Sequence, residues 1–473
     1  MSVMLYDMIL LVIFLIFIGI FLYKKRENLK KEGLLLLYRA SWGIRLINRI
    51  GKKFTKTLNI LSYVVIGLGY LLMGTIVYLF GKIVWIYVLN PEIVRAIKIP
   101  PIMPLIPYLP QVFKLDFLPP FYFTYWIVII AIVAIVHECA HGIFAAHNNV
   151  KIKKTGFGFF PFFLPVFLAA FVELDEKQMQ KKKIFPQMSV LAAGTFANIL
   201  TAILSFGLMW LFFILAFAPA GVTFDSYTYS VASISAVSLV NGIPITDATI
   251  ESISPLINEK GLTEVGIEDE IFLITQEFWE TQQNTEEYIL LYEDAPAINA
   301  NLEGAITKIN DISITEVGEL SEVLSLYSPG EEVTITAVVN EEIKEYEIVL
   351  GMHPTNADRA YLGIGFANQK SSGVMGSIVN ALSLKEPNTY YASKFEAANF
   401  IYYLFWWLVM VSFSIALVNM LPVGIFDGGR FFYLTILAIT KKEKIAKRAF
   451  SVVTYLFLLL LFVIMAFWLV SFF

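Results

Sequence analysis

The chain has 473 residues, of which 57% are hydrophobic and 15% aromatic, and its formal net charge is −4. This composition excludes a soluble globular protein of this size, because several apolar runs reach the roughly 18 residues that cross a bilayer. The slightly negative charge predicts no nucleic-acid partner, and the single cysteine excludes an internal disulfide framework. A lipid bilayer is therefore the expected environment.

The chain begins with an apolar run, Val3–Tyr23, that is too long for a signal peptide and lacks a small-residue cleavage site. We expect a retained membrane span there, followed by a basic segment that ends near residue 57. A second apolar run, Asn59–Leu89, exceeds one perpendicular crossing, which predicts a tilted span or an end at the interface near Lys82. Eight prolines between residues 91 and 120 then exclude regular helix and predict a stiff apolar loop on the membrane.

The third apolar run, from about Phe121 to Ala146, contains the pattern His137-Glu138-Cys139-Ala140-His141. On a helix, His137 and His141 stand on one face, and two neutral imidazoles placed in this way can bind one Zn²⁺ ion. Glu138 lies one position around the helix, where it can take a proton from water. The alternative is a pair of core histidines that bond to each other, but ionisable groups inside a membrane are costly and usually mark function.

A catalytic zinc site needs a third protein ligand. His147 follows His141 by six residues, and a continuous helix turns it well away from the shared histidine face. Cys139 also lies on the wrong face. The third ligand is therefore expected from another part of the chain.

The next segment, Gly156–Val172, is apolar but interrupted by glycine and proline. It predicts a re-entrant hairpin or a membrane-associated strand pair that packs on protein or lines a wet cavity, with a short broken helix as the alternative. Another span, Met188–Pro219, includes the stretch from Gly194 to Asn198. Residues 221–371 then alternate β-branched and polar positions with many acidic residues, which predicts a soluble, mostly β insert.

The apolar run Ala397–Leu421 is broken by Pro422–Gly429, and a last span, Val452–Phe473, follows a basic segment. Asp427 lies in the break. Alone, Asp-Gly-Gly is a turn signal, but here the carboxylate adjoins a span at the depth of the histidines. A buried carboxylate in lipid needs a cation, and a zinc ion bound by His137 and His141 supplies one.

Four basic clusters belong on the cytoplasmic side by the positive-inside rule. They predict one path with six crossings, both termini outside and the acidic insert outside, and they place the histidines nearer the cytoplasmic end of their helix. The clusters cover residues 24–56, 151–154, 181–183 and 441–448.

Over roughly residues 95–440 the sequence resembles the site-2 proteases, a family of intramembrane zinc metalloproteases. The motifs that carry this resemblance are His137–Gly142, Ala170–Glu173, Gly194–Asn198, and Asn419-x-x-Pro422 leading to Asp427-Gly428. The resemblance implies His137, His141 and Asp427 as Zn²⁺ ligands, Glu138 as the catalytic base, and Asn198 and Asn419 as groups that support substrate or transition state. Thr195 and Phe426 depart from the family pattern of proline and leucine, but neither is a ligand.

The second half of the insert resembles a PDZ domain, because Ala295–Asn310, Leu320–Leu324 and Pro329-Gly330 follow that family's order of strand, helix and strand. The segment Gly363–Phe366 is either a carboxylate-binding loop or a strand that leads back to the membrane. Residues 225–294 are compatible with another β-domain.

The expected fold is thus a polytopic α-helical membrane protein with about six spans and a re-entrant hairpin, plus an inserted PDZ-like domain. The expected divisions are a first span with a basic segment, a second span with a Pro-rich loop, a first catalytic part, the insert, a second catalytic part and a last span. Their bounds are residues 1–57, 58–118, 119–220, 221–371, 372–440 and 441–473.

The expected function is regulated intramembrane proteolysis, in which the hairpin offers a strand edge to an unwound substrate. The partners would be transmembrane proteins that are already cleaved or have small ectodomains. A polytopic transporter would show internal repeats and paired broken helices, and none is convincing here. A catalytically idle relative would lack a ligand or the base, and none is missing.

Overall fold

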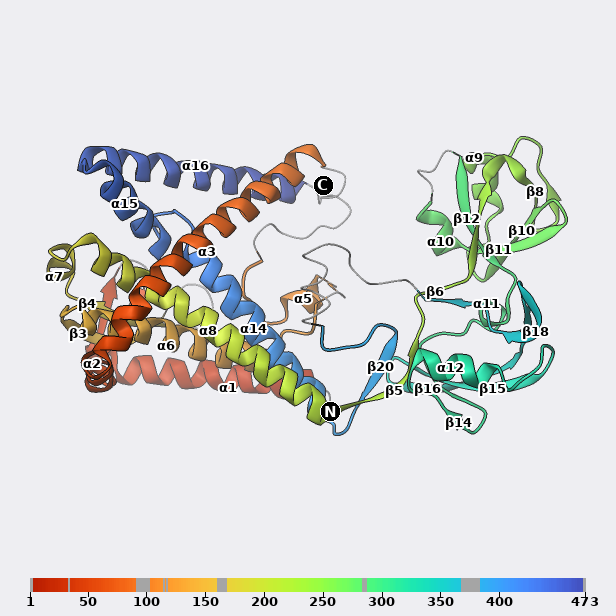
Figure 1. Ribbon diagram of the computed structural model, residues 1–473, viewed down its shortest axis with the longest axis horizontal. Helices are drawn as coiled ribbons and strands as arrows, with labels where there is room; N and C mark the ends of the chain where they lie inside the picture. Colours follow the sequence, from red (N-terminus) through yellow and green to blue (C-terminus); the bar gives the residue numbers. More distant parts are fainter. Residues whose placement is uncertain are drawn as a thin grey trace. The chain divides into compact units, whose positions relative to one another are not determined.

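The computed structural model describes residues 3–32, 35–90, 103–113, 115, 118–159, 168–282, 287–366 and 383–470. They form two compact units (Figure 1). The first unit comprises Met1–Phe212 and Asn399–Phe473, and the second comprises Phe213–Ala398. The insert bounds of 221 and 371 stay a prediction, and residue 371 lies outside the described residues.

The described residues contain six helices that are long and apolar enough to cross a membrane, one at each predicted span. Such helices suit lipid because every backbone polar group is bonded within the segment. The 35 residues of the second helix make it about 52 Å long, so it extends beyond a hydrocarbon core of about 30 Å. The six helices are α1 (Val3–Lys24), α3 (Thr55–Leu89), α6 (Phe123–His147), α8 (Ile184–Ala216), α14 (Ala398–Asn419) and α16 (Glu443–Val470).

The helices of the first unit pack around a core of mainly small and aliphatic side chains. Ala192 and Ala193 of α8 are fully buried there, together with Val65 of α3 and Phe431. Small side chains on α8 let its backbone come close to its neighbours, as is usual between membrane helices. This close packing positions α8 beside the histidine helix α6.

The predicted strand pair is present as β3 (Ile152–Phe159) and β4 (Leu168–Leu174), which run antiparallel. Two further strands that the sequence analysis did not predict, β1 (Leu29–Glu32) and β2 (Leu35–Ala40), complete a sheet of order β1-β2-β3-β4. The basic segment before residue 57 is therefore partly β-structure. Within the described residues β4 is an edge strand of this sheet.

The predicted break after the fifth span is also present. Helix α14 ends at Asn419, and the next helix, α15 (Asp427–Thr440), begins at Asp427 itself. The break is shorter than the expected Pro422–Gly429. Gly428 and Gly429 lie in the first turn of α15, and their lack of a side chain lets the break pack closely against this turn: a Cβ on Gly428 would lie 2.4 Å from the carbonyl carbon of Met420.

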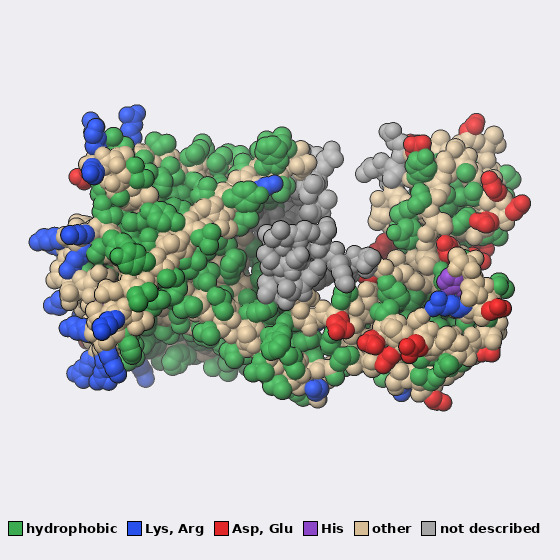
Figure 2. Space-filling model, in the orientation of Figure 1, with side chains coloured by type: hydrophobic (Ala, Val, Ile, Leu, Met, Phe, Trp, Pro, Cys, Tyr) green, Lys and Arg blue, Asp and Glu red, His purple; other side chains and the backbone are tan. Residues whose placement is uncertain are grey.

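The Pro-rich segment is largely irregular where it is described, as predicted. It includes one short helix, α5 (Leu109–Val112), with a proline in its first turn, where the missing N–H is tolerated. Two small helices, α2 (Ile44–Lys53) and α7 (Glu176–Gln180), lie at the end of the first unit where Lys and Arg side chains gather (Figures 1 and 2).

The second unit is mostly β-structure. One six-stranded sheet has the order β7-β12-β11-β10-β8-β9, and the other has β16-β15-β13-β5-β20 with β14 on β13. Gly363–Phe366 contains β19 (Ile364–Gly365), which pairs with β6 (Ser226–Tyr227). Both interpretations of this segment, a carboxylate-binding loop and a strand that leads back to the membrane, stay predictions. The sheet strands are β5 (Phe217–Thr223), β7 (Tyr229–Ser233), β8 (Val237–Val240), β9 (Ile243–Pro244), β10 (Leu262–Ile267), β11 (Glu270–Thr275), β12 (Tyr288–Glu293), β13 (Ala305–Ile309), β14 (Ile312–Ser313), β15 (Glu332–Val339), β16 (Glu342–Val349) and β20 (Thr389–Ser393).

The second unit contains two copies of one supersecondary motif. Strands β8 and β9, helix α9 (Ile250–Ile253) and strands β10 and β11 repeat as β13, β14, α12 (Val317–Leu324), β15 and β16. In each copy an asparagine with positive φ turns the first hairpin. The side-chain oxygen of Asn241 accepts from the N–H of Glu264, and that of Asn310 accepts from Thr334.

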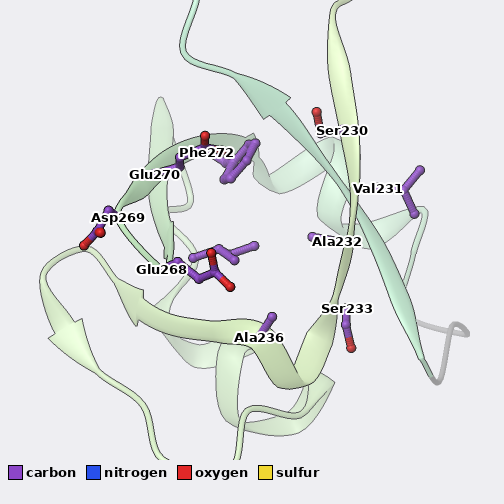
Figure 3. A pocket seen from close by; sticks show the side chains of 10 residues that line it. Ser230, Val231, Ala232, Ser233, Ala236, Glu268, Asp269, Glu270 and Phe272 are labelled. Carbon is purple, nitrogen blue, oxygen red and sulfur yellow. The ribbon is translucent and has the colours of Figure 1, made fainter.

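The second unit also has a cavity of about 430 Å³ beside β7 (Figure 3). In the close view, the acidic turn Glu268–Glu270 lies across the opening from Ser230–Ser233 of β7. The cavity shares no residue with the histidine pair.

Candidate metal centre

The two histidines of the predicted motif meet one turn apart on α6. Their Nε2 atoms are 3.0 Å apart, and both side chains are buried. The helix continues without interruption from Phe123 to His147, so the four-residue spacing alone produces this pairing. Two imidazole nitrogens therefore point to one spot inside the helical unit.

Asp427 reaches the same spot from a segment 290 residues further along the chain. Its Oδ2 lies 3.3 Å from Nε2 of His137 and 3.2 Å from Nε2 of His141. The break between α14 and α15 carries it there, because Asp427 is the first residue of the new helix. The three side chains form a cluster that is close enough to hold a metal ion.

The chemistry and spacing of these three groups fit zinc. Zinc ligands at about 2.0–2.1 Å in a tetrahedral site lie about 3.3 Å from one another, and the edges of this triangle measure 3.0, 3.2 and 3.3 Å. Two imidazoles and one carboxylate are also a usual set for catalytic zinc, which keeps its fourth position open.

Neighbouring backbone orients His141 for this role. Its Nδ1 lies 2.7 Å from the carbonyl oxygen of Val190 on α8. A carbonyl accepts only, so Nδ1 carries the proton and donates it, which leaves the Nε2 lone pair free for a metal.

Asn198 does the same for His137. Its side-chain amide is fully buried and lies 3.0 Å from Nδ1 of His137, while its Oδ1 has no hydrogen-bond partner among the described residues. Exchanging the two similar ends of the amide lets Oδ1 accept the Nδ1 proton and satisfies both groups. Asn198 thus contacts the imidazole of His137, one of the three candidate ligands.

Gly194 allows α8 to approach the cluster. A Cβ at this position would lie 2.5 Å from Nε2 of His141 and 2.5 Å from Cε1 of His137. No side chain fits there without displacing the imidazoles, so the first residue of the Gly194–Asn198 motif has a steric role.

Glu138 lies outside the ligand triangle and faces the sheet. Its Oε2 accepts a hydrogen bond of 2.8 Å from the N–H of Val172 in β4. That N–H therefore points away from β3 and toward α6. The edge of β4 and the carboxylate of Glu138 meet directly beside the histidine helix.

The predicted residue Asn419 is not part of the cluster, and neither are His147 and Cys139, which the sequence excluded as ligands. Asn419 ends α14 and is half-buried, and among the described residues no hydrogen bond joins its side chain to the cluster. His147 contacts Asn59 of α3, with Nε2 2.9 Å from Oδ1. Cys139 packs beside Ile47. The roles assigned to Asn198 and Asn419 stay predictions.

Asp7, a carboxylate in the first candidate span, is only 4% exposed and was not among the predicted residues. It accepts bonds from the backbone N–H groups of Phe123 and Thr124 at 2.7 and 2.9 Å, and from the hydroxyls of Tyr108 and Thr124. Phe123 and Thr124 begin α6, so Asp7 caps the histidine helix from another helix. An ionisable residue within an apolar run was the available signal.

Comparison with protein families agrees with this geometry. The model of peptidase family M50 matches residues 125–464, more than two-thirds of the chain, and the match includes all three candidate ligands. No curated protein matches the chain.

Proposed function

The chain belongs to peptidase family M50, and from this premise we propose that it is a zinc metalloendopeptidase of the site-2 protease type. The members of peptidase family M50 are in general zinc-dependent intramembrane metalloproteases. The proposed reaction is hydrolysis of peptide bonds within or next to the transmembrane segments of membrane-protein substrates. The observation that carries the proposal is the triangle of His137, His141 and Asp427 on helices of a membrane-embedded unit.

We assign the three ligands to one Zn²⁺ ion. When bound, such an ion supplies Lewis acidity that activates water and polarises a carbonyl. His141 and His137 present their Nε2 lone pairs because Val190 and Asn198 engage their Nδ1 atoms.

Glu138 acts as the general base. Its carboxylate is one residue from His137 and takes a proton from the attacking water, then donates that proton to the leaving amine nitrogen. Its hydrogen bond to Val172 holds it on the side of α6 that faces β4. A substrate lying along β4 would therefore pass close to the base.

A transmembrane substrate must unwind before it is cut, because a helix keeps its carbonyls in internal hydrogen bonds. We propose that the unwound segment adds to the outer edge of β4 as a further strand. The N–H of Val172 points away from β3, because it bonds to Glu138. The N–H groups of an edge strand point alternately toward and away from its partner, so the N–H of Ala170 points away from β3 as well.

Proline at position 170 tests the added strand. Ala170→Pro removes one outward N–H and spares the pairing with β3, so cleavage should fall at least tenfold while zinc content stays unchanged. The control, Phe171→Pro, removes an N–H that faces β3 and should disturb the sheet itself. Undiminished cleavage by Ala170→Pro would retire strand addition but leave the metal site intact.

The proposed topology puts the basic clusters in the cytoplasm and the insert outside the cell or in an equivalent compartment. The gathering of Lys and Arg at one end of the helical unit supports it (Figure 2). The active site then lies within the bilayer toward the cytoplasmic side. Cysteine labelling from either side of the membrane, at positions 53 and 444, should report the same side for both.

The proposed activity is tested by Glu138→Gln. This variant keeps the three ligands but loses the base, so it should retain zinc and lose cleavage of a model membrane substrate by at least a hundredfold. Full cleavage by Glu138→Gln would overturn the assignment. If the wild-type protein shows no cleavage, and transport or partner binding persists in Glu138→Gln, the chain is a transporter or a catalytically idle relative instead.

A further inference from the structure

Helix α2 directly precedes a helix that is long and apolar enough to cross a membrane. It ends at Lys53, and α3 begins at Thr55, so only Phe54 separates it from a candidate span. The first apolar turn of that span contains Leu58, which is buried in the core. Helix α2 therefore lies at the N-terminal end of a candidate span.

The surface of α2 is divided into three sectors. At about 100° per residue, the cations fall on one side, opposite the buried residues Ile47 and Gly51. Leu46, which is 59% exposed, lies between these sectors, and Phe54, which is 48% exposed, follows the last residue of the helix. The cationic residues are Arg45, Arg49, Lys52 and Lys53.

The cations on this face are not paired with carboxylates of the described residues. In the part of the chain that the structure describes, no carboxylate forms an ion pair with any of the four. Helix α2 itself has no acidic residue. Trp42, just before the helix, is 52% exposed. A cationic sector beside an exposed apolar and aromatic sector is the layout of a helix that lies in a membrane interface.

The buried sector of α2 packs on the histidine helix just after the ligand turn. A Cβ on Gly51 would lie 2.7 Å from the carbonyl oxygen of Ile143 and 2.8 Å from Cβ of Ala146. A Cβ on Gly142, the residue after His141, would lie 3.0 Å from Cγ2 of Ile47. The backbones of α2 and α6 are thus in close contact.

We propose that α2 is an interfacial helix whose four cations bind the headgroups of anionic phospholipids. Leu46, Phe54 and Trp42 enter the acyl boundary, and the cations next to them reach the phosphates. Near an anionic membrane surface, each Lys or Arg adds to the electrostatic attraction. The ten residues of α2 carry four such cations, so the attraction is concentrated at one site. Because α2 contacts α6, lipid binding also steadies the last turn of the histidine helix.

Hydrogen exchange of the full-length protein in nanodiscs tests this. In wild type, exchange of residues 44–53 should be several-fold slower with phosphatidylglycerol present than in phosphatidylcholine alone. The variant with Arg45, Arg49, Lys52 and Lys53 all changed to Gln should lose this difference. The control, with Lys441, Lys442, Lys444 and Arg448 changed to Gln, removes the same charge elsewhere at the same end and should keep it.

Three results would overturn the proposal. They are equal exchange of the wild-type helix in both lipids, loss of the difference in the control variant as well, and equal protection by inorganic phosphate added to phosphatidylcholine nanodiscs. The readout does not involve cleavage or zinc, so it stands apart from the proposed protease function.

Discussion

The absence of one side chain decides whether the ligand triangle can form. Gly194 presents bare backbone to both imidazoles, and a methyl group there would overlap His141 Nε2. Gly194→Ala should therefore lower zinc affinity at least a hundredfold, because the imidazoles must move out of the triangle. Zinc titration against a chelator measures this.

The control for that change is on the same helix. Gly207 of α8 has nothing within 4 Å of an added Cβ, so Gly207→Ala should bind zinc as wild type does. Equal zinc affinity for both alanine variants would mean that α8 does not approach the histidines as described.

Substitution of Asn198 tests how much a residue that contacts a metal ligand, without binding the metal itself, contributes to zinc affinity. Removing an outer partner of a metal-bound histidine typically costs 10–100-fold in affinity, and we expect Asn198→Ala to fall in this range. Asn198→Asp keeps an oxygen that can accept the Nδ1 proton of His137, so it should recover most of the loss. If the alanine variant binds zinc normally, the hydrogen bond to His137 is not supporting the ligand.

At the scale of elements, Asp7 ties α1 to the start of α6. The first N–H groups of a helix have no partner within it, and here a carboxylate from another helix supplies the acceptors. Asp7→Ala leaves buried donors unsatisfied and should lower the free energy of unfolding by about 3 kcal/mol. Thermal unfolding in micelles should show a smaller loss for Asp7→Asn, which keeps one oxygen; an unchanged melting temperature for Asp7→Ala would exclude the cap.

The six spans and the ligand triangle were predictable for related reasons. The length of an apolar run predicts a span regardless of tertiary contacts. In the predicted path of the chain through the membrane, Asp427 lay at the same depth as the two histidines. The four-residue spacing of His137 and His141 needs only a helix. Local chemistry was sufficient for the histidine pair, whereas Asp427 was predicted from its depth in the path through the membrane and from the resemblance to the site-2 proteases.

Strands β1 and β2 were not predicted. β1 pairs with β2, and the other partner of β2 is β3, which lies more than a hundred residues away. A basic segment gives little alternation, and pairing with a distant strand decides its conformation. The repeat in the insert was missed for another reason. The two copies share only a six-residue sequence motif, Asn-Gly/Asp-Ile-x-Ile-Thr, which begins at Asn241 and at Asn310. A motif this short does not stand out in the sequence.

At the scale of the whole molecule, the second unit joins the chain through paired strands. β5 enters and β20 leaves, and they pair antiparallel from Phe217 opposite Ser393 to Val222 opposite Thr389. Val222 and Thr389 are therefore neighbours, and a short flexible linker can join the two strands when the residues between Thr223 and Thr389 are removed, which also removes the pairing of β13 with β5.

If the insert restricts access to substrates with small ectodomains, that replacement should loosen selectivity. We expect zinc content to stay unchanged and cleavage of a substrate with a bulky ectodomain to rise at least tenfold relative to a trimmed one. A cleavage ratio equal to that of the full chain would show that selectivity resides elsewhere.

The most direct test of the ligand triangle is X-ray absorption at the zinc edge on purified protein. Two imidazole nitrogens and carboxylate or water oxygen should surround one zinc per chain at about 2.0–2.2 Å, and Asp427→Ala should lose the metal. A sulfur neighbour at about 2.3 Å, or an unchanged spectrum with full zinc content in Asp427→Ala, would contradict a site made by His137, His141 and Asp427.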